Sequence, residues 1–238
     1  MITQSYFMPD FAMLNAFIAI LLPMTAGAQF IVTLVLTKGE ICPGQRGRIH
    51  RILPLLFVLW LLVAVQHIYT LLNVVLIGYF YSQVKTGKTR QEGPLKILYL
   101  ANGIAGLAML FAILTAPNWV AAVTLILSCL LLGAIAAHWL LTIARTRLQA
   151  FHRLLPITGI LAAMFMTLCI VPLAARMDPI QLQNVLHSIL LSFSLLVTAV
   201  IIWSWHLLTA KSADKVQLGI SCLVLLTAMT GFHQLYFY

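Results

Sequence analysis

Residues 119–143 read WVAAVTLILSCLLLGAIAAHWLLTI, a segment without a single charged side chain. A helix needs about 20 apolar residues to cross the hydrocarbon core of a bilayer, so this segment is long enough to cross as one helix. Strands of a membrane barrel alternate apolar and polar residues, and this segment does not. A helix in lipid also satisfies its backbone hydrogen bonds internally. The segment therefore predicts a transmembrane helix.

The rest of the chain has a similar composition. Of its 238 residues, 62% are apolar and 8% are charged, whereas soluble proteins carry about 25% charged residues. This composition excludes an ordinary soluble enzyme, a disordered chain and a disulfide scaffold. We predict an all-α, polytopic transmembrane helical bundle that forms a single integral membrane domain over residues 1–238. Its seven predicted spans are residues 11–37, 52–81, 97–116, 119–143, 154–175, 185–209 and 216–238.

Basic residues outnumber acidic ones by 14 to 5, and the net charge is +9. In a soluble protein this excess would suggest nucleic-acid binding. Here the basic residues sit in short loops between apolar segments, where the positive-inside rule predicts them, so no nucleic-acid partner is expected. Four loops hold all but one of them, at residues 38–51, 85–96, 145–153 and 211–215, and Arg176 stands apart. With seven simple spans these loops divide between the two sides of the membrane.

The second apolar run, residues 52–81, decides the topology. As one helix it would be about 45 Å long, against a hydrocarbon core of about 30 Å. The simpler interpretation is one tilted helix that projects from the bilayer. The alternative is a re-entrant or broken pair, with Asn73 and Gly78 near its middle. A broken run gives eight spans and places all four basic loops on one side of the membrane, as the positive-inside rule favours.

A short string occurs twice in the chain. Residues 50–54 read HRILP and residues 152–156 read HRLLP, each after a predicted helix that carries a glycine, Gly27 or Gly133. Both prolines fall in the first turn of the next helix, where the missing N–H costs little. The string indicates either an ancient duplication or shared helix-start chemistry. In a seven-span topology the copies have opposite orientations, so an alternative function is a small inverted-repeat transporter or channel.

Every carboxylate lies in a loop or a terminal segment. A charged side chain at a helix centre costs about 2.5–3.5 kcal/mol on insertion scales. The lack of carboxylates at membrane depth argues against a carboxylate proton relay, an acidic cation site and aspartyl proteolysis. The lack of HExxH and CxxC motifs argues against a metal in this chain. Chemistry at membrane depth must therefore rest on neutral groups.

Neutral polar groups concentrate in the second run, where Gln66, His67 and Tyr69 lie within four residues. Such groups can hydrogen-bond a quinone oxygen or accept a proton. The alternative role is an interhelical hydrogen bond, worth about 0.6 kcal/mol.

The other histidines and the small residues have structural interpretations. His138, His187 and His206 could in principle ligate haem. They lie toward predicted span ends that carry tryptophans, as interfacial anchors do, so no haem is expected. Groups of small residues predict close helix contacts at residues 26–28, 103–106 and 133–137.

Residues 26–40 read AGAQFIVTLVLTKGE. This stretch resembles the first helix of the membrane anchor subunit of dimethyl sulfoxide reductase, a family with a similar Ala-Gly, Phe-Ile-Val, Leu-x-Leu and Lys-Gly-acidic pattern. A basic loop follows in both, then a helix similar to FVLWLL at residues 57–62 and a polar-small motif similar to LANGI at residues 100–104. The resemblance covers residues 1–115.

The resemblance implies a membrane anchor and electron-transfer subunit of the bacterial cytoplasmic membrane, with eight spans and no haem. Such anchors hold a molybdopterin catalytic subunit and an iron–sulfur subunit, oxidise menaquinol, and pass the electrons to the iron–sulfur subunit. Asn73 and Gly103 align with a His and a Glu of the family's quinol site. The expected menaquinol contacts are Gln66, His67, Tyr69, Asn73 and Asn102.

The first basic loop is the largest polar surface that the sequence offers to a partner subunit. An iron–sulfur subunit would dock on its five cationic or titratable side chains, Lys38, Arg46, Arg48, His50 and Arg51. The alternative is that these residues only set the membrane topology. Membrane lipid is the remaining expected partner.

Overall fold

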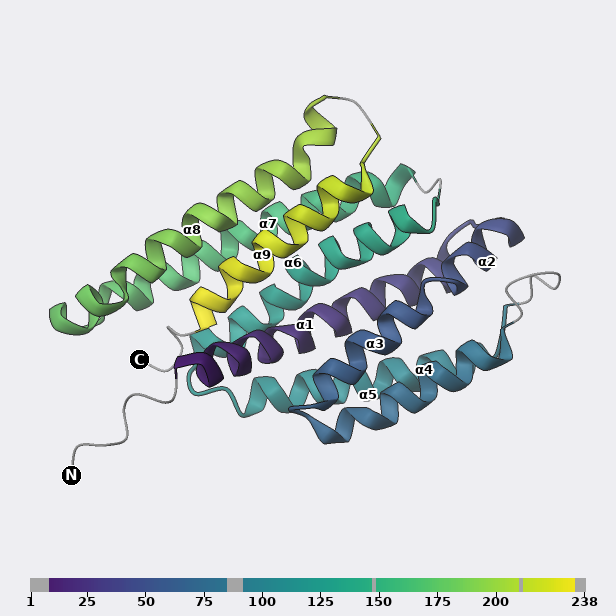
Figure 1. Cartoon of the computed structure of the whole chain (residues 1–238), viewed down its shortest axis with the longest axis horizontal. Helices are drawn as coiled ribbons and strands as arrows, with labels where there is room; N and C mark the ends of the chain where they lie inside the picture. Colours follow the sequence, from purple (N-terminus) through teal and green to yellow (C-terminus); the bar gives the residue numbers. More distant parts are fainter. Residues whose placement is uncertain (1–8, 85–91, 147–148, 210–211, 234–238) are drawn as a thin grey trace.

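The computed structural model describes residues 9–84, 92–146, 149–209 and 212–233. Within these residues the regular elements are all helical (Figure 1), which confirms the predicted all-α bundle. The elements are α1 Pro9–Lys38, α2 Pro43–His50, α3 Leu53–Ala64, the 3-10 turn η1 Ile68–Thr70, α4 Leu71–Gln83, α5 Leu95–Leu114, α6 Trp119–Ile143, α7 Gln149–Ala175, α8 Pro179–Leu208 and α9 Lys215–His233.

Seven helical segments in the described part of the chain are long and apolar enough to cross a membrane. They are α1, α2 together with α3, and α5 to α9. The protein is therefore a multi-pass membrane protein, as its composition predicted. The α6 helix begins and ends where the sequence predicted the span over residues 119–143.

The second apolar run is broken, so the interpretation as one tilted helix is wrong. The α3 helix ends at Ala64, and α4 begins at Leu71 and packs beside α3 as a hairpin. The break lies at residues 65–70, where His67 has a non-helical backbone (φ −122°, ψ 74°). Asn73 and Gly78 lie within α4, not at the break. The α4 helix, which runs back beside α3, is only about 20 Å long. It is therefore shorter than the hydrocarbon core of about 30 Å that a membrane span must cross.

Contacts at the turn and along the two helices stabilise the hairpin of α3 and α4. At the turn, the Thr70 backbone N–H (2.8 Å) and the Thr70 hydroxyl (2.8 Å) both donate to the His67 carbonyl oxygen, so the start of the returning segment is bonded to the break. Along the hairpin, a side chain on Gly78 would lie 3.1 Å from the Phe57 ring, so the glycine lets α3 and α4 approach closely. The fold-back also buries the Asn73 amide completely, where a single projecting helix would leave it in lipid or water.

Because α4 returns, the helices that precede the four basic loops all end at the same end of the bundle, toward the right in Figure 1. The helices α1, α4, α6 and α8 all end there, and Lys38, Arg145 and Lys215 lie at this basic end. Arg176 lies at the opposite end, between α7 and α8. Lys85, Lys88, Arg90, Arg147 and Lys211 lie outside the described residues.

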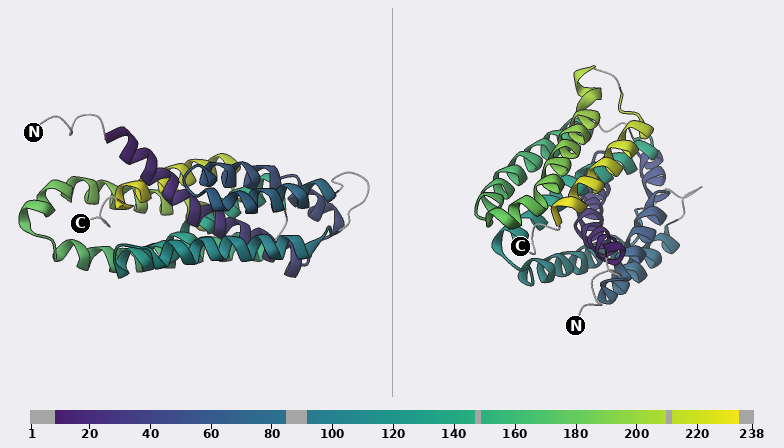
Figure 2. Two further views of the ribbon diagram at one scale, coloured as in Figure 1. Left: turned by 90° about the horizontal axis from the view of Figure 1, so that it is seen from below. Right: turned by 60° about the vertical axis from the view of Figure 1, so that its left-hand side comes forward.

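The two halves of the chain repeat one packing scheme. In the first half, α1 and α4 each pack on both α3 and α5. In the second half, α6 and α8 each pack on both α7 and α9. Contacts between the halves also match, since α1 meets α9 as α6 meets α5. In Figure 2 (right), α1 lies between the C-terminal helices and the blue hairpin of α3 and α4. This is the pattern expected of a duplicated four-helix unit.

The repeated strings sit at equivalent places in the two halves. HRILP joins α2 to α3, HRLLP lies near the start of α7, and both occupy the basic end. The helices that precede and follow them run in the same direction in both halves (Figure 1). The opposite orientation that a seven-span topology implied is therefore wrong, because the broken second run restores the parallel arrangement.

The halves meet at a crossing of α1 and α6 in which two glycine backbones touch. A side chain on Gly133 would lie 2.6 Å from the Gly27 Cα, and one on Gly27 would lie 2.8 Å from the Gly133 Cα. This confirms the predicted close contacts at residues 26–28 and 133–137. The third predicted contact is wrong at its glycines, because a side chain on Gly103 or Gly106 would meet nothing within 4 Å.

Candidate functional site

Five polar side chains from four helices meet inside the N-terminal half, and we call this group the amide cluster: Gln29 and Thr33 of α1, Trp60 of α3, Asn73 of α4 and Asn102 of α5. Gln29 is its centre. The Trp60 indole N–H donates to Gln29 Oε1 (2.5 Å), and Gln29 Nε2 donates to Asn102 Oδ1 (2.9 Å). Except for Asn102, the members are 3% exposed or less.

The Asn73 amide is bonded in either orientation of its oxygen and nitrogen. Its Nδ2 lies 3.0 Å from Gln29 Oε1. The reverse orientation turns the nitrogen toward the Ala101 carbonyl oxygen (2.9 Å) and the oxygen toward the Trp60 indole nitrogen (3.1 Å). An unpaired amide in hydrocarbon costs several kcal/mol. The cluster therefore ties α1, α3, α4 and α5 together at one depth.

That depth lies toward the basic end. At 1.5 Å per residue, Gln29 is about 14 Å from Lys38 at the end of α1, and Asn102 is about 10 Å from Leu95 at the start of α5. The tip of the α3–α4 hairpin is farther away, about 20 Å from the basic end along α4.

Asn102 forms the lipid-facing edge of the cluster. Its Oδ1 accepts from Gln29 Nε2 and from the Thr33 hydroxyl (3.2 Å). Its Nδ2 has no hydrogen-bond partner among the described residues. The side chain is half-buried, so a ligand can reach this nitrogen. Beside it, Gly103 and Gly106 leave open space on the surface of α5. The edge thus presents an amide donor to a ligand that arrives from the lipid.

The five predicted quinol contacts fall into two separate groups. Asn73 and Asn102 lie in the amide cluster, while Gln66, His67 and Tyr69 lie at the hairpin tip. At the tip the Tyr69 hydroxyl is 3.2 Å from His67 Nδ1, and the Tyr69 ring packs edge-on against Phe111 at 5.7 Å.

The sequence prediction missed three members of the amide cluster: Gln29, Thr33 and Trp60. Gln29 and Thr33 are four residues apart, so they share one face of α1. This pair of polar residues on one face of an apolar helix was the available signal.

A second polar group, the histidine cluster, occupies the C-terminal half with His138 of α6, His152 of α7, and Trp203 and His206 of α8. The Trp203 indole N–H donates to His138 Nδ1 (3.0 Å), so the His138 proton sits on Nε2 and is donated to His152 Nδ1 (2.8 Å). His152 Nε2 in turn donates to the Thr146 carbonyl oxygen (3.2 Å). These hydrogen bonds connect α6, α7 and α8. Each residue donates to the next in the order Trp203, His138, His152 and Thr146.

The histidine cluster differs from what the sequence predicted. His138 is 0% and His206 5% exposed, so neither is an interfacial anchor. Burial of His138 is possible because two neighbouring helices supply its partners. Among the described residues, no group of three or more His, Cys, Asp or Glu is arranged to hold a metal ion.

The five predicted docking residues lie on α2 or beside it at the basic end. Lys38 and Arg51 are exposed, and Arg46 forms an ion pair with Glu92 (3.0 Å). His50 is 1% exposed and packs edge-on against Phe80 at 5.8 Å. It therefore lies beneath the surface that Lys38, Arg51 and the half-buried Arg46 and Arg48 offer to a partner.

Comparisons with known proteins support an integral membrane protein. A protein of Haemophilus influenzae described as uncharacterized is 37% identical over 149 residues, which cover 56% of this chain and 54% of that protein. The chain thus spans about half the length of this relative. No solved structure matches the chain. A family model described as an integral membrane domain matches residues 1–236, and the chain belongs to this integral membrane domain family.

Proposed function

We propose that the protein is the membrane anchor and quinol-oxidising electron-transfer subunit of a molybdopterin and iron–sulfur oxidoreductase in a bacterial cytoplasmic membrane. The resemblance of residues 26–40, 57–62 and 100–104 to the anchor of dimethyl sulfoxide reductase supports it. The short helix α4 and the seven longer segments together make eight membrane-embedded passes, the number that the resemblance implies. The observation that carries the proposal is the free Asn102 Nδ2 at the lipid-facing edge of the amide cluster.

In this proposal Asn102 holds one ring oxygen of menaquinol. Its Nδ2 donates to that oxygen, while Gln29 and Thr33 fix the amide through Oδ1. The open surface at Gly103 and Gly106 leaves room for the flat ring. Oxidation of the quinol releases two electrons and two protons. The cluster consists of amides, an indole and a hydroxyl, none of which is a base at neutral pH, so it orients the ring and the protons pass to water.

The depth of Asn102 favours this place over the hairpin tip. The partner-docking residues lie at the basic end, about 10 Å from Asn102 along α5 and about 20 Å from the tip along α4. Without haem, electrons must travel directly from the ring to the partner, so the nearer position suits electron transfer. His67 and Tyr69 then serve the turn of the hairpin rather than the quinol.

A fluorescent menaquinol analogue tests the site in membranes. We expect Asn102→Leu to raise its Kd about tenfold, because a hydrogen bond made in hydrocarbon is lost. The control is His67→Ala, at the hairpin tip, which we expect to leave the Kd unchanged. If His67→Ala weakened binding and Asn102→Leu did not, the ring would bind at the tip. Unchanged quenching in both variants would contradict quinol binding at either place.

The orientation of the bundle follows from the same proposal. Basic loops face the cytoplasm, so the exposed thiol of Cys42, between α1 and α2, would face it as well. We expect a membrane-impermeant maleimide to label Cys42 in inverted vesicles but not in intact cells. Labelling in intact cells would place the basic end outside.

The same thiol should show a shifted pH dependence. The backbone N–H of Gln45, in the first turn of α2, lowers the pKa of the Cys42 thiol below its ordinary value. The reactive thiolate is therefore more abundant at neutral pH than in a free cysteine. We expect the rate of labelling to rise with pH about a midpoint lower than that of the detergent-unfolded chain. An equal or higher midpoint would contradict the lowered pKa.

A further inference from the structure

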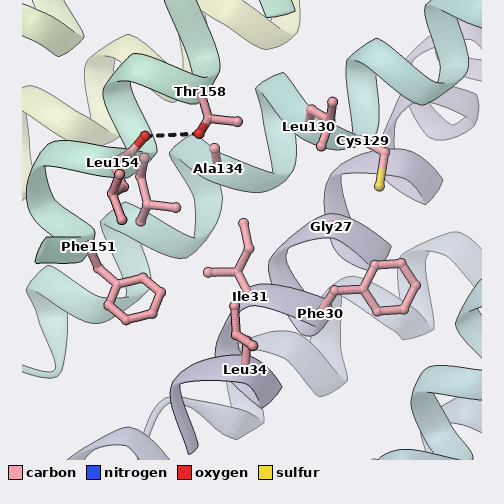
Figure 3. Close-up of a pocket in the computed structure, with 11 residues that line it drawn as sticks. Gly27, Phe30, Ile31, Leu34, Cys129, Leu130, Ala134, Phe151, Leu154 and Thr158 are labelled. Carbon is pink, nitrogen blue, oxygen red and sulfur yellow. Dashed lines mark hydrogen bonds between the residues drawn. The ribbon is translucent and has the colours of Figure 1, made fainter. Parts of the chain in front are cut away.

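An apolar groove of about 280 Å³ lies between α1, α6 and α7 (Figure 3). Its walls include Gly27, Ile31 and Leu34 of α1, Ala134 of α6, and Leu154 and Thr158 of α7. It opens to the lipid-facing surface, because Leu34, Leu130 and Leu154 at its edges are 49%, 46% and 56% exposed. Both α1 and α7 pack on α6, and the groove is the space left between them.

The chemistry of the groove excludes a polar ligand group. Its one hydroxyl, on Thr158, already donates to the Leu154 carbonyl oxygen at 2.9 Å, the dashed line in Figure 3. A cavity of about 150 Å³ lined by apolar residues stays dry and holds a benzene ring, so this groove has about twice the room for an apolar group. Its remaining polar side chain, the Cys129 thiol, is only a weak donor, so the groove offers no free hydroxyl or amide donor to the oxygens of a quinone. Its occupant is therefore a hydrocarbon chain.

The groove is separate from the amide cluster. Gln29 and Thr33 lie on the face of α1 opposite to Gly27, Ile31 and Leu34, as the helical repeat of 100° per residue requires. A chain in the groove therefore does not compete with a ring at Asn102.

The basic end identifies the head group of the occupant. Lys38 is exposed and lies one turn beyond Leu34 on the same face of α1. An ammonium at this point, at the end of the bundle that holds the basic loops, complements a phosphate. We propose that the groove binds an acyl chain of one anionic phospholipid, with its phosphate beside Lys38.

Native mass spectrometry of the purified protein tests this with phosphatidylglycerol and phosphatidylcholine of the same chains. We expect one tightly held phosphatidylglycerol in the wild type. Thr158→Phe and Ile31→Phe each place a ring in the groove and should remove the lipid. Leu107→Phe, at a side chain of α5 that is 66% exposed, is the matched control and should retain it. Lys38→Gln should lower the preference for phosphatidylglycerol about fivefold, the effect of one basic residue at a membrane surface.

Two ring variants keep the test decisive if one of them fails to fold. Wild-type lipid occupancy in either folded ring variant would overturn the groove as the site. Equal binding of both lipids by the wild type, or an unchanged preference in Lys38→Gln, would overturn the role of Lys38.

Discussion

Gly133→Val is expected to destabilise the bundle by about 3 kcal/mol or more. The valine side chain would meet the Gly27 backbone, since even its Cβ would lie 2.6 Å from the Gly27 Cα. A backbone cannot move aside as a side chain does, so the cost falls at or above the upper end of the roughly 1–3 kcal/mol typical of overpacking. That is a large share of a total stability of about 5–15 kcal/mol. Thermal unfolding in detergent measures it.

Gly103→Val is the matched control, because nothing lies within 4 Å of a side chain at Gly103. A lipid-facing change of this kind should alter stability by about 0.5 kcal/mol or less. The reciprocal variant Gly27→Val attacks the same contact and should cost about as much as Gly133→Val. Because both variants separate the same pair of helices, their effects should not add in the double variant. Equal stability of Gly133→Val and Gly103→Val would contradict the crossing.

Reversing the charge of Lys38 and Arg51 is expected to release the proposed partner subunits. Both side chains are exposed at the basic end, and glutamates there would repel an acidic docking surface, since like charges across an interface cost several kcal/mol. We expect roughly tenfold less iron and molybdenum to be retained with the purified chain. Arg176→Glu, an exposed change at the opposite end, should leave retention unchanged.

The reversal has a second control, because basic residues also set membrane topology. Cys42 labelling should still mark the basic end as cytoplasmic in the Lys38→Glu/Arg51→Glu variant. Full retention of both metals by a correctly oriented variant would contradict docking at this surface.

The sequence predicted the spans well because each must be long and apolar whatever its neighbours are. It did not locate the break in the second run, since no charged residue or proline marks it between residue 55 and residue 81. The polar string from Gln66 to Thr70, interpreted as a ligand site, contains the turn itself. The returning helix α4 is also held by the distant pairing of Asn73 with Gln29, which local sequence does not reveal.

The sequence predicted the candidate site only in part for the same reason. Asn73 and Asn102 were predicted and do meet, but through Gln29, whose role depends on three other helices. His138 was wrongly predicted to be an interfacial anchor because it lies near a helix end and beside a tryptophan. Its burial depends on Trp203, 65 residues away, and such pairs follow from packing rather than from periodicity.

A single preparation tests the proposal that this chain anchors an iron–sulfur and molybdopterin enzyme. The chain should be tagged, purified from its native membranes in mild detergent, and analysed for metals. We expect iron and molybdenum to copurify in fixed ratio to the chain, with the iron in clusters that a menaquinol analogue reduces. A chain that purifies alone, without iron or molybdenum, while still folded and correctly oriented would contradict the account.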